Sequence, residues 1–241
     1  MTKHVGEFHH HDIHGFKLYL PDFVYGGIDG AITTFAVVAG VAGAQLSAVI
    51  VLMLGFANLL ADGFSMAVSN YLSVKSEREY YQKLVETEKH EINTIPEQEK
   101  EEIRVIYKEK GFSGKLLEQV VEVITKDEKV WLETMMVDEL GMLKDKRIPW
   151  KSALTTFAAF LLIGLIALLP FIGLFFFDLV QSNTFFVSAL LTFLALFIVG
   201  SVKAKIVEKN WVYSGIQTML VGGVAALIAY GIGYGVSILV G

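Results

Sequence analysis

Long stretches without a charged residue constrain this chain more than any other feature of its sequence. Residues 30–61, 152–177, 179–202 and 211–241 contain no Asp, Glu, Lys or Arg. A helix needs about 20 mostly apolar residues to cross the ~30 Å hydrocarbon core of a bilayer. Helices buried in soluble proteins are usually shorter or amphipathic. We therefore predict an all-α membrane protein rather than a soluble globular one.

The apolar stretches divide into five predicted transmembrane helices. The first stretch continues to residue 74 after the single Asp62, so residues 23–74 are too long for one crossing and fit two, joined by a turn near residues 43–45. The predicted spans are residues 23–43, 46–73, 152–176, 182–202 and 212–239. The predicted domains are a polar N-terminal tail (1–22), spans 1–2 (23–74), a polar insert (75–151) and spans 3–5 (152–241).

The basic residues all fall on one side of this predicted topology. The chain has 20 Lys and Arg, and they lie in the N-terminal tail, the polar insert and residues 203–209. The connections on the opposite side contain none. Because loops rich in Lys and Arg stay in the cytoplasm, we expect the tail and the insert 75–151 to be cytoplasmic. The tail has no signal-peptide pattern, and we assign no fixed role to its histidines, which are His4, His9, His10, His11 and His14.

The polar insert is predicted to form three helices. The first continues the second span without a break to about residue 92, and the second starts at Pro96, where proline is tolerated in the first turn. Glycines and a serine at 111–114 end the second helix. Apolar residues then recur at helical spacing, which predicts one third helix over residues 114–140 with Gly141 as its C-terminal cap.

Glutamates recur at a spacing that can bind a metal ion. Glu88 and Glu91 share a face at the end of the first helix of the insert, and Glu99 and Glu102 share one at the start of the second. A chain reversal at Pro96 would bring the two pairs together. Clustered carboxylates repel one another unless a cation holds them. Such a cluster is therefore a candidate cation site.

A third group of donors occurs near the end of the insert, where Glu139 shares a helix face with Met135 and Met136. Carboxylates suit hard divalent ions and thioethers favour softer transition metals, so the combination suits Fe²⁺ or a similar ion. The same glutamate spacing is also typical of solvated helix faces, and methionines commonly fill cores. From these residues alone both interpretations stay open.

Two carboxylates lie inside the predicted spans. Asp29 and Asp62 are costly there and are functional candidates by default, although Asp29 could also have a structural role near the membrane surface. Asp62 belongs to a polar stripe of every fourth residue on the second span, which must face protein or water rather than lipid. Asp29 and Thr33 on the first span are expected to face this stripe. The members of the stripe are Asn58, Asp62, Met66 and Asn70.

Several of these motifs together resemble the vacuolar iron transporter family. In the spans they are Gly27-Ile28-Asp29-Gly30, Ser65-Met66-Ala67 and Tyr71-Leu72-Ser73-Val74. In the insert they are Glu88-x-x-Glu91, Pro96-x-x-Glu99-x-x-Glu102, Ile106-Tyr107-x-x-x-Gly111-Phe112 and Met135-Met136-x-x-Glu139-Leu140-Gly141. The resemblance covers nearly the whole chain, including five spans with a helical insert after the second.

The resemblance implies a homodimer that exports Fe²⁺, and often Mn²⁺ or other divalent ions such as Zn²⁺ and Co²⁺, from the cytosol in exchange for protons. It implies no prosthetic group and no enzymatic activity. It also implies that the insert binds metal through residues matching the family's ligands, and that Asp29 and Met66 line the transport path. The implied metal ligands are Glu88, Glu91, Glu99, Glu102, Glu139, Met135 and Met136.

The chain departs from the family pattern at one position. Many plant members have a glutamate where this chain has Asn70, between Ser69 and Tyr71. The proton-linked carboxylate expected there is missing. We therefore hypothesise that Asp62, eight residues earlier, takes over its role.

The same residues are compatible with functions other than proton-coupled transport. A divalent-metal channel without proton coupling and a membrane-anchored metal-binding scaffold share the same residues and stay open. A membrane enzyme is disfavoured because His90 is the only histidine beyond residue 14. No basic-aromatic patch indicates nucleic acid binding, and no glycine-rich phosphate loop indicates ATP. The expected location is the cell membrane in a prokaryote or the vacuolar membrane in a eukaryote.

Overall fold

The computed structural model describes residues 15–177 and 183–240, and these residues form helices and connecting segments without a strand. The histidine-rich segment His4–His14 and part of the predicted loop near residue 180 lie outside the described residues. Close packing divides the chain into a membrane unit, residues 1–72 and 147–241, and a helical unit, residues 73–146.

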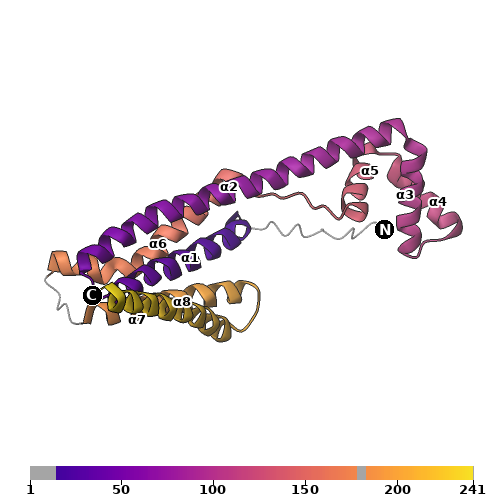
Figure 1. Cartoon of the computed structure of the whole chain (residues 1–241). Coiled ribbons are helices and arrows are strands. Elements are labelled where there is room, and N and C mark those ends of the chain that lie inside the picture. The colour runs from indigo at the N-terminus through magenta and orange to yellow at the C-terminus, as the bar shows by residue number, and fades with distance from the viewer. Residues whose placement is uncertain (1–14, 178–182, 241) are drawn as a thin grey trace. The chain divides into compact units, whose positions relative to one another are not determined.

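Among the described residues, five helices are long and apolar enough to cross a membrane, as the sequence predicts. They are α1 (Gly15–Gly43), α2 (Ala48–Thr94), α6 (Pro149–Phe177), α7 (Thr184–Ile206) and α8 (Trp211–Val240) (Figure 1). The predicted turn between the first two spans is confirmed, because the chain reverses through Gln45, whose φ is +56°. Leu46 N donates to Val41 O at 3.1 Å and closes the end of α1.

The start of α1 differs from the prediction. The helix begins at Gly15 and includes Pro21, whereas residues 1–22 were expected to be a polar tail. Asp22 is only 4% exposed in this first part of α1. The carboxylate of Asp22 forms an ion pair with Arg147. Because its charge is paired, Asp22 can be buried in a helix that begins before the predicted residue 23.

Helix α1 lies at the centre of the membrane unit and contacts α6, α7 and α8 (Figure 1). Its core includes Phe35, Val38, Phe160 and Leu168. Gly30 packs directly on the backbone of α6, where a Cβ atom would lie 2.8 Å from the Cα of Phe160 and closer still to its carbonyl oxygen. Small residues therefore set the distance between α1 and α6, as is usual between membrane helices.

The helical unit departs from the predicted three helices. The first two are confirmed: α2 runs unbroken to Thr94, and α3 (Pro96–Glu109) begins at Pro96. The predicted single helix 114–140 is wrong, because the chain forms α4 (Gly114–Thr125), α5 (Glu128–Thr134) and a π-helical turn, η1 (Met135–Glu139).

The break in the third helix has a local cause. Asp127 adopts an extended backbone and its carboxylate accepts hydrogen bonds from Lys129 N at 2.9 Å and Val130 N at 3.3 Å. An Asp at this position caps a new helix better than it continues an old one. The predicted end at Gly141 is confirmed, since its φ is +63°. The core of the unit consists of Ile92, Ile103, Leu117, Val121, Ile124, Trp131 and Met135.

Candidate functional site

The five glutamates of the helical unit lie close together in the structure. We call Glu88, Glu91, Glu99, Glu102 and Glu139 the acidic cluster. Glu88 and Glu99 are each only 3% exposed, and their side chains are hydrogen-bonded to each other. Because a carboxylate can only accept, one of the two must carry the shared proton.

Burial and mutual repulsion raise the pKa of three glutamates of the acidic cluster. Burial is the main cause that raises the pKa of Glu88 to about 8, with contributions from the hydrogen bond to Glu99 and from the charges of Glu139, Glu99 and Glu91. Burial also raises the pKa of Glu99 and of Glu139, and the charges of Glu102 and Glu91 add to both, whereas the hydrogen bond with Glu88 lowers the pKa of Glu99. These interactions join glutamates from α2, α3 and η1 into one electrostatic unit.

Two oxygens of the acidic cluster are buried without a partner. Oε1 of Glu88 and Oε2 of Glu99 accept no hydrogen bond from any described residue. Orphaned buried oxygens are uncommon and call for an explanation such as an ion. Oxygen donors of this kind fit a hard divalent cation. Within the described residues, however, no group of three or more acidic or histidine side chains is arranged so that it could already hold a metal ion.

The two methionines beside the acidic cluster differ in their surroundings. Met135 and Met136 are both buried and both belong to η1, a π-helical turn of the type often found at functional sites. Met135 packs in the hydrophobic core of the unit with Ile103 and Trp131. Met136 is not a member of that core. Met136 is therefore the better candidate for a sulfur ligand, and Met135 has a packing role.

Metal-free stability is expected to fall as the pH rises. An unfolded glutamate ionises near its ordinary pKa of 4.5, whereas Glu88 in the folded unit keeps its proton up to about pH 8. Between these values the folded state binds more protons, so the free energy of unfolding decreases with pH. Thermal unfolding of the full chain, followed by circular dichroism in chelator, should show a lower midpoint at pH 8.5 than at pH 5.5. Glu88→Gln should weaken this dependence, and Glu109→Gln should not.

A second set of polar side chains lies where α1 and α2 face each other. We call Asp22, Asp29 and Thr33 of α1, with Asn58, Asp62, Met66 and Asn70 of α2, the polar seam. The four α2 residues are all half-buried, and Gly55, Leu59, Gly63 and Ala67 beside them are buried.

Three pairs of residues from α1 and α2 face each other along the polar seam, two of them in hydrogen-bonding contact. Asn70 Nδ2 donates to Asp22 Oδ1 at 3.0 Å, and Asn58 Nδ2 contacts Thr33 Oγ1 at 3.4 Å. Between these pairs, Asp29 and Asp62 lie close enough for their carboxylates to repel when both are ionised. The structure therefore brings the stripe of α2 against the acidic face of α1.

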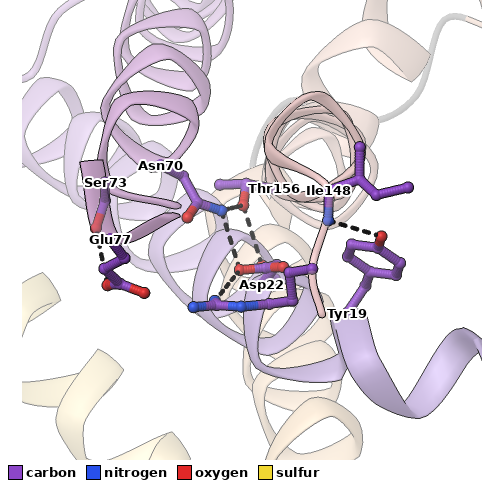
Figure 2. A network of polar contacts seen from close by, with 8 residues as sticks. Tyr19, Asp22, Asn70, Ser73, Glu77, Ile148 and Thr156 are labelled. Atoms are coloured by element: carbon purple, nitrogen blue, oxygen red, sulfur yellow. Dashed lines mark hydrogen bonds and ion pairs between the residues drawn. The ribbon is translucent and has the colours of Figure 1, made fainter. Parts of the chain in front are cut away.

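Asn70 belongs to a hydrogen-bonded network that the sequence did not reveal. It donates to Thr156 Oγ1 at 2.7 Å as well as to Asp22, and Arg147 Nη1 lies 3.5 Å from Asp22 Oδ1. Figure 2 shows Asp22 of α1, Asn70 of α2 and Thr156 of α6 converging, and Tyr19 OH nearby accepts from Ile148 N at 3.1 Å. Asp22 and Arg147 are 125 residues apart. No local pattern marks this pair, so only the fold identifies it.

Comparison with known proteins agrees with the fold and the motifs. The model of the VIT family matches residues 20–234. A vacuolar iron transporter of Toxoplasma gondii is 38% identical over 229 residues, which are 92% of this chain and 76% of the relative. One from Centaurea cyanus is 36% identical over 89% of this chain and 86% of its own length. Vacuolar iron transporter 1 of Arabidopsis thaliana is 34% identical over 87% and 82%.

The names of these relatives are those of transporters, which agrees with the expectation that the chain is not an enzyme. The matched residues include the whole helical unit and most or all of each of the five membrane helices. The chain belongs to the vacuolar iron transporter (VIT) family.

Proposed function

We propose that this protein transports Fe²⁺ across a membrane, out of the cytosol and in exchange for protons. The observation that carries the proposal is the polar seam, because two neighbouring carboxylates within membrane helices are costly unless a cation or a proton occupies them. The relatives named as vacuolar iron transporters support iron as the cargo. Met66 supplies a thioether beside the carboxylates, which suits Fe²⁺ better than Mg²⁺ or Ca²⁺.

The acidic cluster is proposed to collect the metal before transport. Its buried oxygens without partners and its mutual repulsion both favour a bound divalent cation. Fe²⁺ and Mn²⁺ fit carboxylate oxygens with Met136, and Zn²⁺ and Co²⁺ fit less specifically. Metal binding would displace the proton shared by Glu88 and Glu99, so affinity should increase with pH.

Proton exchange is proposed to occur at Asp29 and Asp62. Asn70 cannot carry a proton in place of the missing glutamate, because its amide is neutral and donates to Asp22 and Thr156. Two carboxylates that repel each other in a medium of low dielectric are unfavourable when both are ionised and nothing is bound between them. They therefore hold either a cation or protons. Entry of Fe²⁺ between them would therefore release protons, and return of protons would release the metal.

A homodimer is proposed from the surface that α2 leaves uncovered. Phe64 is 64% exposed and Leu60 is 59% exposed on the membrane part of this helix. Ser65 and Ser69 are exposed beside them, next to the half-buried stripe. Polar groups facing lipid are unfavourable, so a second copy covering α2 would complete the burial of the polar seam.

The orientation follows from the distribution of Lys and Arg. We propose that the helical unit is cytoplasmic, because residues 75–151 carry 15 of the 20 basic residues. The membrane would be a vacuolar membrane in a eukaryote or the cell membrane in a prokaryote. In both cases transport runs away from the cytosol.

The test is metal uptake by proteoliposomes with and without an acidic interior. Uptake of Fe²⁺ and Mn²⁺ should increase when the interior is acidic, because inward metal movement is coupled to outward proton movement. Glu102→Ala should weaken uptake at low metal concentration without abolishing it. Uptake indifferent to the gradient would indicate a channel instead. No uptake of any divalent ion would indicate a membrane-anchored scaffold.

Asp62→Asn is expected to uncouple metal transport from the proton gradient. The amide retains an oxygen that can contact the metal but cannot release a proton at neutral pH. Uptake should therefore become nearly independent of the imposed gradient. Gln217→Asn, an exposed position on α8, serves as the control. Fully gradient-driven uptake by Asp62→Asn would show that the proton is carried elsewhere.

A further inference from the structure

A cavity of about 490 Å³ lies between the first half of α1 and the end of α7 in the membrane unit. Two charged side chains line it, Asp29 of α1 and Lys203 of α7, and the remaining lining side chains are aliphatic apart from Tyr25. Tyr25 is 62% exposed and Val207, which lines the cavity from α7, is 55% exposed. The cavity is therefore open at the surface of the membrane unit and is not part of its core.

The length of the cavity matches the depth of one leaflet of a bilayer. Its lining follows α1 from Leu20 to Asp29. Nine residues of α-helix rise about 14 Å, which is close to half of the ~30 Å hydrocarbon core. Its floor is made of packed apolar side chains, since Leu20 and Val24 belong to a buried cluster with Val199 of α7. A long, open and aliphatic groove of this kind fits an acyl chain.

One end of the cavity is basic. Helices α1 and α7 are the first and fourth spans, so α1 begins on the side of the membrane where α7 ends. Lys203 lines the cavity, and Lys17 precedes Pro21 by one turn on the same face of α1. Both lysines are exposed, and neither forms an ion pair with an acidic side chain within the described ranges. Two ammonium groups are thus available to an anion at this end.

The charges also determine the direction in which a lipid would lie. Lys17 and Asp29 are 12 residues apart on α1, which is about 18 Å along the helix. An anionic headgroup is attracted to the end with the lysines and repelled from the end with Asp29. A phospholipid therefore fits only with its phosphate at the start of α1 and its chain directed toward Asp29.

We propose that the cavity between α1 and α7 binds one anionic phospholipid, with its phosphate on Lys203 and Lys17 and an acyl chain along α1. Basic pockets between membrane helices bind acidic headgroups in this way. A zwitterionic phospholipid brings the same chain, but its own ammonium offsets its phosphate, so the site discriminates by headgroup. With the orientation proposed above, the lipid belongs to the cytoplasmic leaflet. The lipid site does not depend on the proposed transport function.

Lys205 provides the matched control for Lys203. It carries the same charge two residues further along α7, and two residues of a helix are about 200° apart. Lys205 lines a different cavity, with Ser201 and Trp211. General attraction between the basic end of the protein and an anionic membrane would involve both lysines equally. A lipid bound in the cavity between α1 and α7 would involve Lys203 and not Lys205.

The test counts lipids bound to the full-length protein in detergent by native mass spectrometry, with dioleoyl-phosphatidylglycerol as the probe. The wild type and Lys205→Gln should bind one molecule per chain in preference to dioleoyl-phosphatidylcholine. Lys203→Gln and Lys17→Gln should each weaken this binding about fivefold, because each removes one cation that attracts the phosphate. Val207→Trp fills the cavity from an exposed position and should abolish the preferred binding. Equal thermal unfolding midpoints without lipid would show that the variants are folded.

Other outcomes would overturn the lipid site. Equal weakening by Lys203→Gln and Lys205→Gln would indicate diffuse attraction, and equal affinity for phosphatidylcholine would show that no headgroup is recognised. Displacement of phosphatidylglycerol by inorganic phosphate would indicate a site for a soluble anion. A wild type that binds no lipid and elutes as a dimer, with Val207→Trp eluting as a monomer, would show that a second copy covers the cavity. Iron transport is tested separately by uptake into proteoliposomes, so its failure would leave the lipid site standing.

Discussion

Replacing Asp29 with alanine is expected to abolish metal transport while the protein still folds. Asp29 is half-buried on α1, it faces Asp62 of α2, and its backbone oxygen accepts from Thr33 Oγ1 at 2.9 Å, a bond that the substitution keeps. Removing a charged ligand in a medium of low dielectric is worth several kcal/mol, and each ~1.4 kcal/mol is a factor of ten, so uptake should fall about a hundredfold or more.

The measurement is gradient-driven Fe²⁺ and Mn²⁺ uptake by proteoliposomes at equal protein content. Asp29→Glu keeps the charge and should retain part of the activity, because only the position of the carboxylate changes. Gln217→Ala on the exposed face of α8 should behave as wild type. Elution as one symmetric species in detergent would confirm that Asp29→Ala is folded. Wild-type uptake by folded Asp29→Ala would remove Asp29 from the transport path.

Replacing Gly30 with alanine is expected to destabilise the membrane unit strongly. The added Cβ would overlap the carbonyl oxygen of Phe160, a backbone atom that cannot rotate away, and would lie 2.8 Å from Phe160 Cα. Relief requires α1 and α6 to separate where Phe160 is fully buried. Overpacking of a core typically costs about 1–3 kcal/mol, and a backbone clash between two helices should reach the upper part of that range.

Gly231 provides the matched control, because a Cβ added there meets no atom within 4 Å. Alanine favours a helix interior by up to about 1 kcal/mol over glycine, so Gly231→Ala should be neutral or stabilising. Each kcal/mol of lost stability lowers the unfolding midpoint by roughly 2–4 °C. Thermal denaturation of the detergent-purified proteins should therefore show a midpoint several degrees below that of the wild type for Gly30→Ala, but not for Gly231→Ala. Equal midpoints would mean that α1 and α6 are not in close contact at Gly30.

Some features of this protein follow from its sequence because their causes are local. Long runs of residues without charge determine the membrane helices, because such runs are too long for the core of a soluble protein and too apolar for an exposed loop. Pro96 and Gly141 mark a helix start and a helix end by their own backbone preferences, and both are found where predicted. The spacing of Glu88, Glu91, Glu99 and Glu102 placed each pair on one face of a helix. For the same reason, the residues of the acidic cluster could be named before their surroundings were known.

Other features depended on which local preference prevailed. The apolar periodicity of residues 114–140 predicted one helix, but Asp127 capped a new one instead. Periodicity reports only which side faces a core, and it is nearly the same for one helix and for two in succession. Met135 and Met136 are equivalent in sequence, yet only Met135 joins the hydrophobic core.

The tertiary structure alone decided how distant polar groups are paired. Nothing near Asp22 or Arg147 in the sequence indicates that they meet, since 125 residues separate them. Asn70, expected only to line a path, is also a hydrogen-bond donor to α1 and α6. Local sequence determines which helices form, because backbone preference and transfer into the membrane act residue by residue. The partners of a buried charge are determined only when helices pack, because the energy of an ion pair depends on the distance between its atoms.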